Sequence, residues 1–214
     1  MNADNDLMAA KSAYCYGNGS VPNIVDPDGT DAIWITSIWY LGPLTIPFGH
    51  TSLLIQDAQG TWYYTMYASN GVYLRAVPDY YMDSLPHFNE YLDSISEGNG
   101  VWCDYNFATY IEGDFSEALT YFEEIRDAYR IASRGLRRKK TQNKRYNLFT
   151  NNCVTVSLDM LEMGITPEGE SMKTWMEEQC RRYKLQYPAS FIPICNYKPI
   201  QELFGNASFT KPEE

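Results

Sequence analysis

Histidine is scarce in this sequence of 214 residues, which contains only His50 and His87. No H-E-x-x-H motif is present, and no two cysteines form a C-x-x-C pair, so the common zinc-site patterns are missing. Asp26, Asp28 and Asp31 surround a glycine as in part of a calcium loop, but the later ligands are absent. An ordinary Asp/Gly turn is the better interpretation. We expect no metal and no cofactor, and a calcium- or zinc-dependent hydrolase is disfavoured.

Cysteines are few and odd in number, at positions 15, 103, 153, 180 and 195. An odd count without close pairs argues against a disulfide framework and leaves at least one thiol free.

Positive charge is also in short supply, since the formal net charge is −10. A general nucleic-acid partner is therefore not expected, because phosphate binding depends on a positive field. The segment 134–145 is an exception, with seven of the 17 Lys and Arg residues. A solvated surface is the favoured interpretation of this run. Contact with an anionic cell-wall polymer is the alternative.

Long apolar runs are absent, and the first residues lack the basic start and apolar core of a secretory signal. We expect synthesis in the cytoplasm without a signal peptide and no stable membrane insertion. Some export routes use no cleaved signal, so secretion stays open.

The hydrophobic patterns predict an α+β fold in one domain spanning 1–214, with irregular extensions at 1–30 and 196–214. A buried strand is expected at 32–42, two strands at 49–57 and 61–69, and further strands at 71–78 and 100–111. Helices are expected at 83–95, 114–136, 153–163 and 171–185.

The residues "DAQG" between the second and third expected strands have the composition of a hairpin turn. If Asp57 to Gly60 form the loop, Gln56 pairs with Thr61 and His50 lies opposite Tyr67. If the turn is tighter, His50 lies opposite Ser69 instead.

Cys153 is the cysteine best placed for chemistry, because it directly follows Asn151 and Asn152 at the start of a predicted helix. Either asparagine can cap the helix. The free N–H groups and the helix dipole favour a thiolate, and the same N–H groups can hold an oxyanion. The alternative is that Cys153 is a small core residue, since cysteine is among the most buried residue types.

A thiol nucleophile needs an imidazole, so the search reduces to the two histidines. His87 follows a proline in a segment that we expect at the surface. His50 opens a strand whose other residues alternate into a core, and it can project from a rigid sheet end. His50 is therefore the candidate base.

The stretches "FGHTSLLI" and "YNLFTNNCVTVSLDML" together resemble the circularly permuted branch of the NlpC-type, papain-like superfamily. In that branch the histidine strand precedes the helix that bears the cysteine. The resemblance covers residues 45–70 and 145–165.

This resemblance implies a small antiparallel sheet packed on the nucleophile helix, with Cys153 attacking an acyl carbon and His50 acting as base and then acid. Asn151 and Asn152 would belong to the oxyanion site at the helix N-terminus. A third group should orient His50, commonly His, Asn or Gln in the family. The sequence departs from that pattern, and the two hairpin registers leave Tyr67 or Ser69 for this role.

Related proteins act on cell walls, proteins or lipids. The lipid acyltransferases usually carry an apolar anchor or lid, which is not found here, so a cysteine peptidase or amidase acting on peptidoglycan stem peptides is the leading expectation. The chain is similar to antibacterial effectors of type VI secretion, which implies a secretion carrier, an immunity protein and action in the target cell periplasm. The alternatives are a non-catalytic binding module on the same fold, or a thiol protease or acyltransferase acting on protein or lipid.

Overall fold

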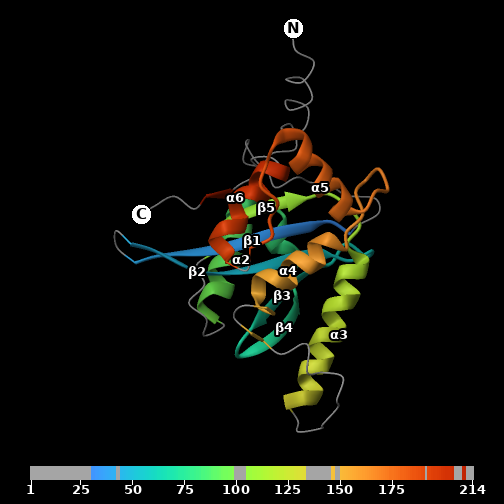
Figure 1. Cartoon of the computed structure of the whole chain (residues 1–214). Helices are drawn as coiled ribbons and strands as arrows, with labels where there is room; N and C mark the ends of the chain where they lie inside the picture. The colour runs from blue at the N-terminus through green and yellow to red at the C-terminus, as the bar shows by residue number, and fades with distance from the viewer. Residues whose placement is uncertain are drawn as a thin grey trace.

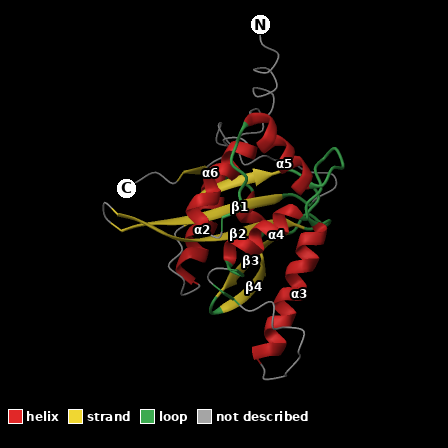
Figure 2. Cartoon of the chain, in the orientation of Figure 1, coloured by secondary structure: helices red, strands yellow, loops and turns green. Residues whose placement is uncertain are grey.

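A computed structural model gives the fold, and it describes residues 30–41, 44–98, 105–133, 146–147, 150–190, 192–204 and 209–210. These residues form a six-stranded antiparallel sheet of order β4-β3-β2-β1-β5-β6 with helices packed against it (Figure 2). The α+β class predicted from the sequence is confirmed.

The strands are β1 (Ala32–Leu41), β2 (Leu44–Gln56), β3 (Trp62–Ala68), β4 (Gly71–Ala76), β5 (Tyr105–Ile111) and the short β6 (Phe209–Thr210). The helices are the 3₁₀ helix η1 (Asp79–Met82), α2 (Leu85–Gly98), α3 (Ser116–Ser133), α4 (Cys153–Glu162), α5 (Met172–Tyr183) and α6 (Pro193–Phe204). Within the described residues, the strands and helices expected from the sequence are present. β2 begins five residues earlier than expected, at Leu44 rather than residue 49.

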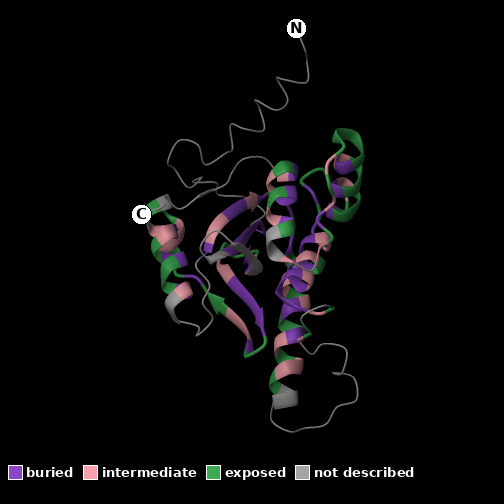
Figure 3. Ribbon diagram, turned by 60° about the vertical axis from the view of Figure 1, so that its left-hand side comes forward, coloured by how far each residue is buried: buried purple, intermediate pink, exposed green. Residues whose placement is uncertain are grey.

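Side chains of β1 alternate between two apolar cores, one on each face of the sheet. Trp34 packs in a core with α3, α4, α5 and α6, on what we call the α4 face. Ile33 and Ile35 pack in the other core with α2, on the α2 face. Figure 1 shows α4 crossing the sheet, and Figure 3 shows buried strands between helices whose outer sides are exposed. The period-2 pattern of the strands therefore fixes which helix each side chain meets.

The hairpin between β2 and β3 has a register that differs from both predicted ones. Gln56 pairs with Trp62, and the loop is the five-residue segment 57–61. Asp57 closes this loop, because its carboxylate accepts the N–H groups of Gln59 and Thr61 at 2.9 Å each. Gly60 supports the turn with a φ of 83°. Since side chains alternate between the two faces of a sheet, a one-residue shift of the register exchanges every cross-strand partner for a residue that points to the other face.

The C-terminal end of α4 is tied to the start of α3 by close packing. Gly164 follows α4, and a Cβ there would lie 2.3 Å from the ring of the fully buried Phe115. Asp114 and Ile165 also bridge through backbone hydrogen bonds of 2.8 and 2.9 Å. Gly164 is therefore needed for this close approach, beyond its predicted role as a helix stop.

Residues 193–204 form α6, so the predicted irregular extension from 196 is wrong for this segment. Ile200 is fully buried and Leu203 is 9% exposed, both in the α4-face core. Proline at the first helical position is favourable, and the burial of these side chains offsets the hydrogen bond that Pro199 removes inside the helix. The predicted extension at 1–30 lies outside the described residues except for Thr30.

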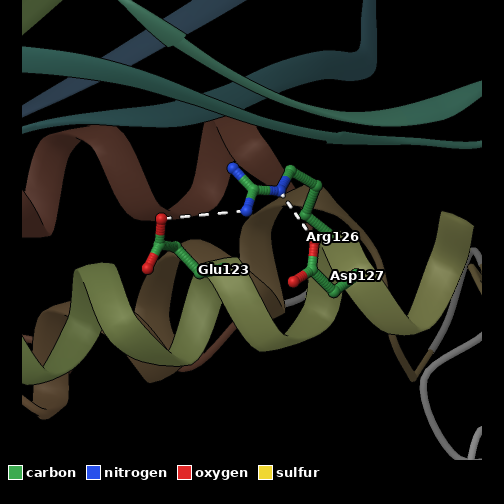
Figure 4. Close-up of polar contacts among 3 residues, drawn as sticks. All are labelled: Glu123, Arg126 and Asp127. Carbon is green, nitrogen blue, oxygen red and sulfur yellow. Dashed lines mark hydrogen bonds and ion pairs between the residues drawn. The ribbon is translucent and has the colours of Figure 1, made fainter.

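α3 carries ion pairs between partly exposed side chains. Arg126 lies 3.8 Å from Glu123 and 3.1 Å from Asp127 (Figure 4). All three side chains are at least partly exposed, so these pairs contribute little to stability. The apolar face of α3, not these charges, fixes its position on the sheet.

Candidate functional site

Asn152 caps the start of α4, so the cap is Asn152 and not Asn151. Its extended backbone (φ −117°, ψ −174°) places the side-chain oxygen 3.0 Å from the N–H groups of Val154 and Thr155. In return, the Thr155 hydroxyl accepts the Asn152 N–H at 2.9 Å. This reciprocal capping box makes the helix start rigid, which fixes the position of the next residue, Cys153.

Cys153 is the first residue of α4 and is only 4% exposed. The backbone N–H groups of Thr51, Val154 and Cys153 itself lie near its sulfur and favour the thiolate. These three donors lower the pKa of the thiol, but burial outweighs them and raises it to about 11. The net direction is opposite to the expectation from the helix dipole, because the dipole acts here within an apolar core.

The Cys153 sulfur lies where β3 separates from β2. The Leu53 N–H points towards β3, since it donates to the Thr65 hydroxyl at 3.3 Å. Leu53 and Thr65 form the first pair of the β2–β3 ladder. The Thr51 N–H lies two residues earlier on the same edge of β2, and it faces the Cys153 sulfur instead of β3. This amide belongs to the peptide bond between His50 and Thr51, so the sulfur lies beside the backbone of the candidate base.

His50 lies in the regular part of β2, paired with Ser37 of β1, and is 5% exposed. Its Nε2 lies 3.3 Å from the hydroxyl of Ser52, and its ring meets the edge of Tyr105 at a centroid distance of 6.1 Å. His50 therefore shares the α2 face with Ser52. Burial lowers the pKa of the imidazole to about 4, so His50 is neutral near pH 7 in this conformation.

The Cys153 sulfur and the His50 imidazole thus lie on different sides of the peptide bond between His50 and Thr51. Backbone N–H groups lie near the Cys153 sulfur, and the hydrogen-bond partner of the imidazole is Ser52. Among the described residues, no hydrogen bond joins the sulfur to the imidazole. The structure brings the thiol to the backbone of His50 but leaves its side chain on the opposite face.

Tyr67 and Asn151 contact each other, whereas Ser69 lies apart in an exposed turn. The Tyr67 hydroxyl accepts the Asn151 Nδ2–H at 2.9 Å, and its ring stacks on Tyr146 at 5.7 Å. Burial raises the pKa of Tyr67. Tyr67 belongs to the α4-face core, whereas Ser69 lies exposed in the turn after β3. Tyr67 and Asn151 therefore line the Cys153 side of the sheet, and neither of the registers that paired His50 with Tyr67 or Ser69 is the observed one.

Sequence reasoning missed Ser52 and Tyr105. Ser52 lies two residues after His50 on one strand, a spacing that places both side chains on the same face. This spacing is a signal that the sequence contained. Tyr105 comes from β5, and its hydroxyl lies 3.0 Å from that of Ser52. No local pattern could reveal this contact.

Thr51 adds an unusual polar atom near Cys153. Its hydroxyl oxygen is buried without a hydrogen-bond partner, although its backbone N–H meets the sulfur and its carbonyl lies 3.5 Å from the Ser157 hydroxyl. A buried unsatisfied hydroxyl is costly and often marks a functional region.

The remaining candidates have other surroundings or lie outside the described residues. His87 is partly buried in α2, with its ring 3.9 Å from that of Tyr80 between centroids. Cys180 is buried in α5, whereas Cys195 is exposed in α6. Cys15, Cys103 and the basic run 134–145 lie outside the described residues.

Asp31 is buried and accepts the Tyr110 hydroxyl and the Gly113 N–H, which is a structural role at the sheet end. The described part of the chain holds no group of three or more His, Cys, Asp or Glu residues able to bind a metal ion. Within the same residues, every helix is too short or too polar to cross a bilayer.

The fold and the site together define an α+β protein with a buried cysteine at the start of a helix that packs on an antiparallel sheet. No protein-family model, curated protein or solved structure matches the chain. The functional argument therefore depends on the residues and geometry described above.

Proposed function

We propose that the protein is a cysteine hydrolase that cleaves amide bonds, built on a papain-like core of the permuted NlpC type. One observation carries the proposal: Cys153 is the first residue of α4, where the backbone N–H groups of Thr51, Val154 and Cys153 favour its thiolate beside the peptide bond of His50. Such converging donors suit a thiolate before attack and a carbonyl oxyanion after it.

In the proposed reaction, His50 takes the proton from the Cys153 thiol as the sulfur attacks the carbonyl carbon. The C–N bond then breaks, and the proton on the imidazole passes to the leaving amine, which leaves an acyl group on the sulfur. Water next gives a proton to His50 while its oxygen attacks the thioester. The C–S bond breaks, the carboxylic acid departs, and the sulfur recovers its proton.

Burial favours the neutral forms of both groups before substrate binds, since it raises the pKa of Cys153 and lowers that of His50. The proposal therefore uses His50 as a general base during attack and requires no preformed ion pair. It also requires the imidazole to reach the sulfur when substrate binds. Because the imidazole lies on the α2 face beside Ser52, this step requires its side chain to change position when substrate binds.

For the substrate, we propose a bond in peptidoglycan stem peptides, with the chain acting as a secreted antibacterial effector. The support is the resemblance of "FGHTSLLI" and "YNLFTNNCVTVSLDML" to the permuted NlpC-type branch. A secretion carrier and an immunity protein follow from the same likeness.

The test is incubation of purified protein with cell-wall sacculi under reducing conditions, followed by analysis of released fragments. Wild type and Cys195→Ala, which removes an exposed thiol of α6, should release the same muropeptides. Cys153→Ala should release none. If wild type releases nothing, the peptidoglycan assignment is lost; if Cys153→Ala is as active as wild type, the nucleophile is lost.

A second candidate is a non-catalytic binding module on the same fold. The burial of Cys153, at 4% exposure, and the Ser52 partner of His50 favour it. Alkylation separates the two candidates: iodoacetamide should modify a functional Cys153 and abolish amide hydrolysis, and an added substrate fragment should slow this modification while Cys195 reacts as before. A Cys153 thiol that stays unreactive under these conditions supports the binding module.

A further inference from the structure

A chain of four polar side chains crosses the α2 face from the candidate base into the core. His50 Nε2 lies 3.3 Å from Ser52 Oγ, Ser52 Oγ lies 3.0 Å from the Tyr105 hydroxyl, and that hydroxyl lies 2.8 Å from the Tyr64 hydroxyl. All four residues are buried. They come from β2, β3 and β5, so three strands cooperate to hold one imidazole.

The partner of one ring nitrogen determines which nitrogen of a histidine carries the proton. A hydroxyl can accept one hydrogen bond while it donates another. If Ser52 accepts from His50 Nε2, its own proton goes to Tyr105, and the Tyr105 proton goes to Tyr64. Every group in the chain then has a partner, which is what a buried polar network requires.

We infer that Ser52 is the positioning residue of His50: it accepts the Nε2–H and thereby leaves Nδ1 as the nitrogen that takes the proton. This inference deepens the proposed function and rests on it. The orienting group is then a hydroxyl backed by two phenols, in place of the His, Asn or Gln that the resemblance led us to expect.

The surroundings suit a neutral imidazole, and the proposed reaction then sets the direction of the hydrogen bonds. The titratable groups buried in the α2-face core are the phenols of Tyr64, Tyr91 and Tyr105, with those of Tyr73, Tyr81 and Tyr110 packed against it, and Cys153 approaches from the α4 face. Phenols are neutral near pH 7, and burial raises the pKa of Tyr91 further. A neutral imidazole that donates from Nε2 fits these neutral neighbours. When Nδ1 also gains a proton during the reaction, Ser52 keeps accepting from Nε2–H, so the hydrogen bond strengthens as charge develops.

Three variants test the inference. Ser52→Ala removes the acceptor, and Ser52→Thr keeps a hydroxyl at the same position. Thr109→Val is the matched control, because Thr109 is a buried hydroxyl residue of β5 that pairs with Trp34 of the α4-face core. Ser52→Ala should lower kcat by about 10- to 100-fold with little change in KM, as expected for loss of a hydrogen bond to a charged group. Ser52→Thr should recover most of the activity, and Thr109→Val should retain it.

Imidazole NMR supplies a readout that does not depend on catalysis. Two-bond ¹⁵N–¹H correlations of His50 should show the proton on Nε2 in wild type and Ser52→Thr, and a mixture of tautomers in Ser52→Ala. If wild type carries the proton on Nδ1, or if Ser52→Ala matches Thr109→Val in both tautomer and kcat, the inference is wrong. If no variant, wild type included, hydrolyses any amide substrate while the tautomer still responds to Ser52, the positioning role stands and the proposed hydrolase fails.

Discussion

The titration of His50 predicts a loss of stability in mild acid. Burial lowers the pKa of this imidazole from 6.5 to about 4 in the folded chain. The unfolded chain therefore takes up a proton at a pH where the folded chain stays neutral, and protonation favours unfolding. The contribution of His50 to stability is fully present above about pH 6.5 and is lost progressively as the pH falls towards 4.

The size of this effect follows from the pKa difference. One pKa unit corresponds to about 1.4 kcal/mol. The fall from 6.5 to about 4 is therefore equivalent to about 3 kcal/mol in total. Between pH 7 and pH 4.5 we expect a loss of about 2 kcal/mol from this residue alone. That is a large part of the 5 to 15 kcal/mol typical of a folded domain.

The assay is urea unfolding of wild type and His50→Gln at pH 7 and pH 4.5. Glutamine does not titrate and can still hydrogen-bond Ser52. Asp114 and Asp159, whose pKa values are shifted in opposite directions, are present in both proteins and cancel in the comparison. Wild type should lose about 2 kcal/mol more than the variant on acidification. Parallel losses in the two proteins would show that His50 is not buried in neutral form.

Three further substitutions test the packing around α4 by chemical denaturation. Gly164→Ala should cost about 1 to 3 kcal/mol, because its Cβ would meet the Phe115 ring at 2.3 Å; an unchanged stability would contradict this close approach. Asn152→Ala should cost about 1 to 2 kcal/mol, whereas Asn152→Asp keeps the cap and should cost less while slowing Cys153 alkylation; equal losses would contradict the capping role. Met160→Ala, at a fully buried site, should cost about 2 to 5 kcal/mol and Met163→Ala clearly less; the reverse order would contradict the core position of Met160.

The local elements could be read from the sequence because each depends on a short-range pattern. The branched and aromatic run of β1 and the 3.6-residue spacing of α3 both predicted the observed elements. The α6 segment was missed because this part of the chain is rich in proline, which is unfavourable inside a helix. Its burial against β1, β2 and β5 is a tertiary effect that outweighs local propensity.

The hairpin shows how one residue changes a site prediction. Both predicted registers were wrong, because the Asp57 carboxylate extends the loop to Thr61 through two backbone N–H groups. The shift places Tyr67 on the α4 face and His50 on the α2 face. The predicted partners of His50 across the hairpin, Tyr67 and Ser69, are therefore wrong.

The sequence by itself determined the helix that starts at Cys153, its asparagine cap and the scarcity of histidine that singles out His50. These properties depend on residue type and on contacts within a few positions. Only the tertiary structure decided that Ser52 and Tyr105 meet beside His50, and that burial raises the pKa of Cys153 to about 11 despite the helix N-terminus. Strand register and desolvation depend on residues far apart in the chain, and no local pattern encodes either of them.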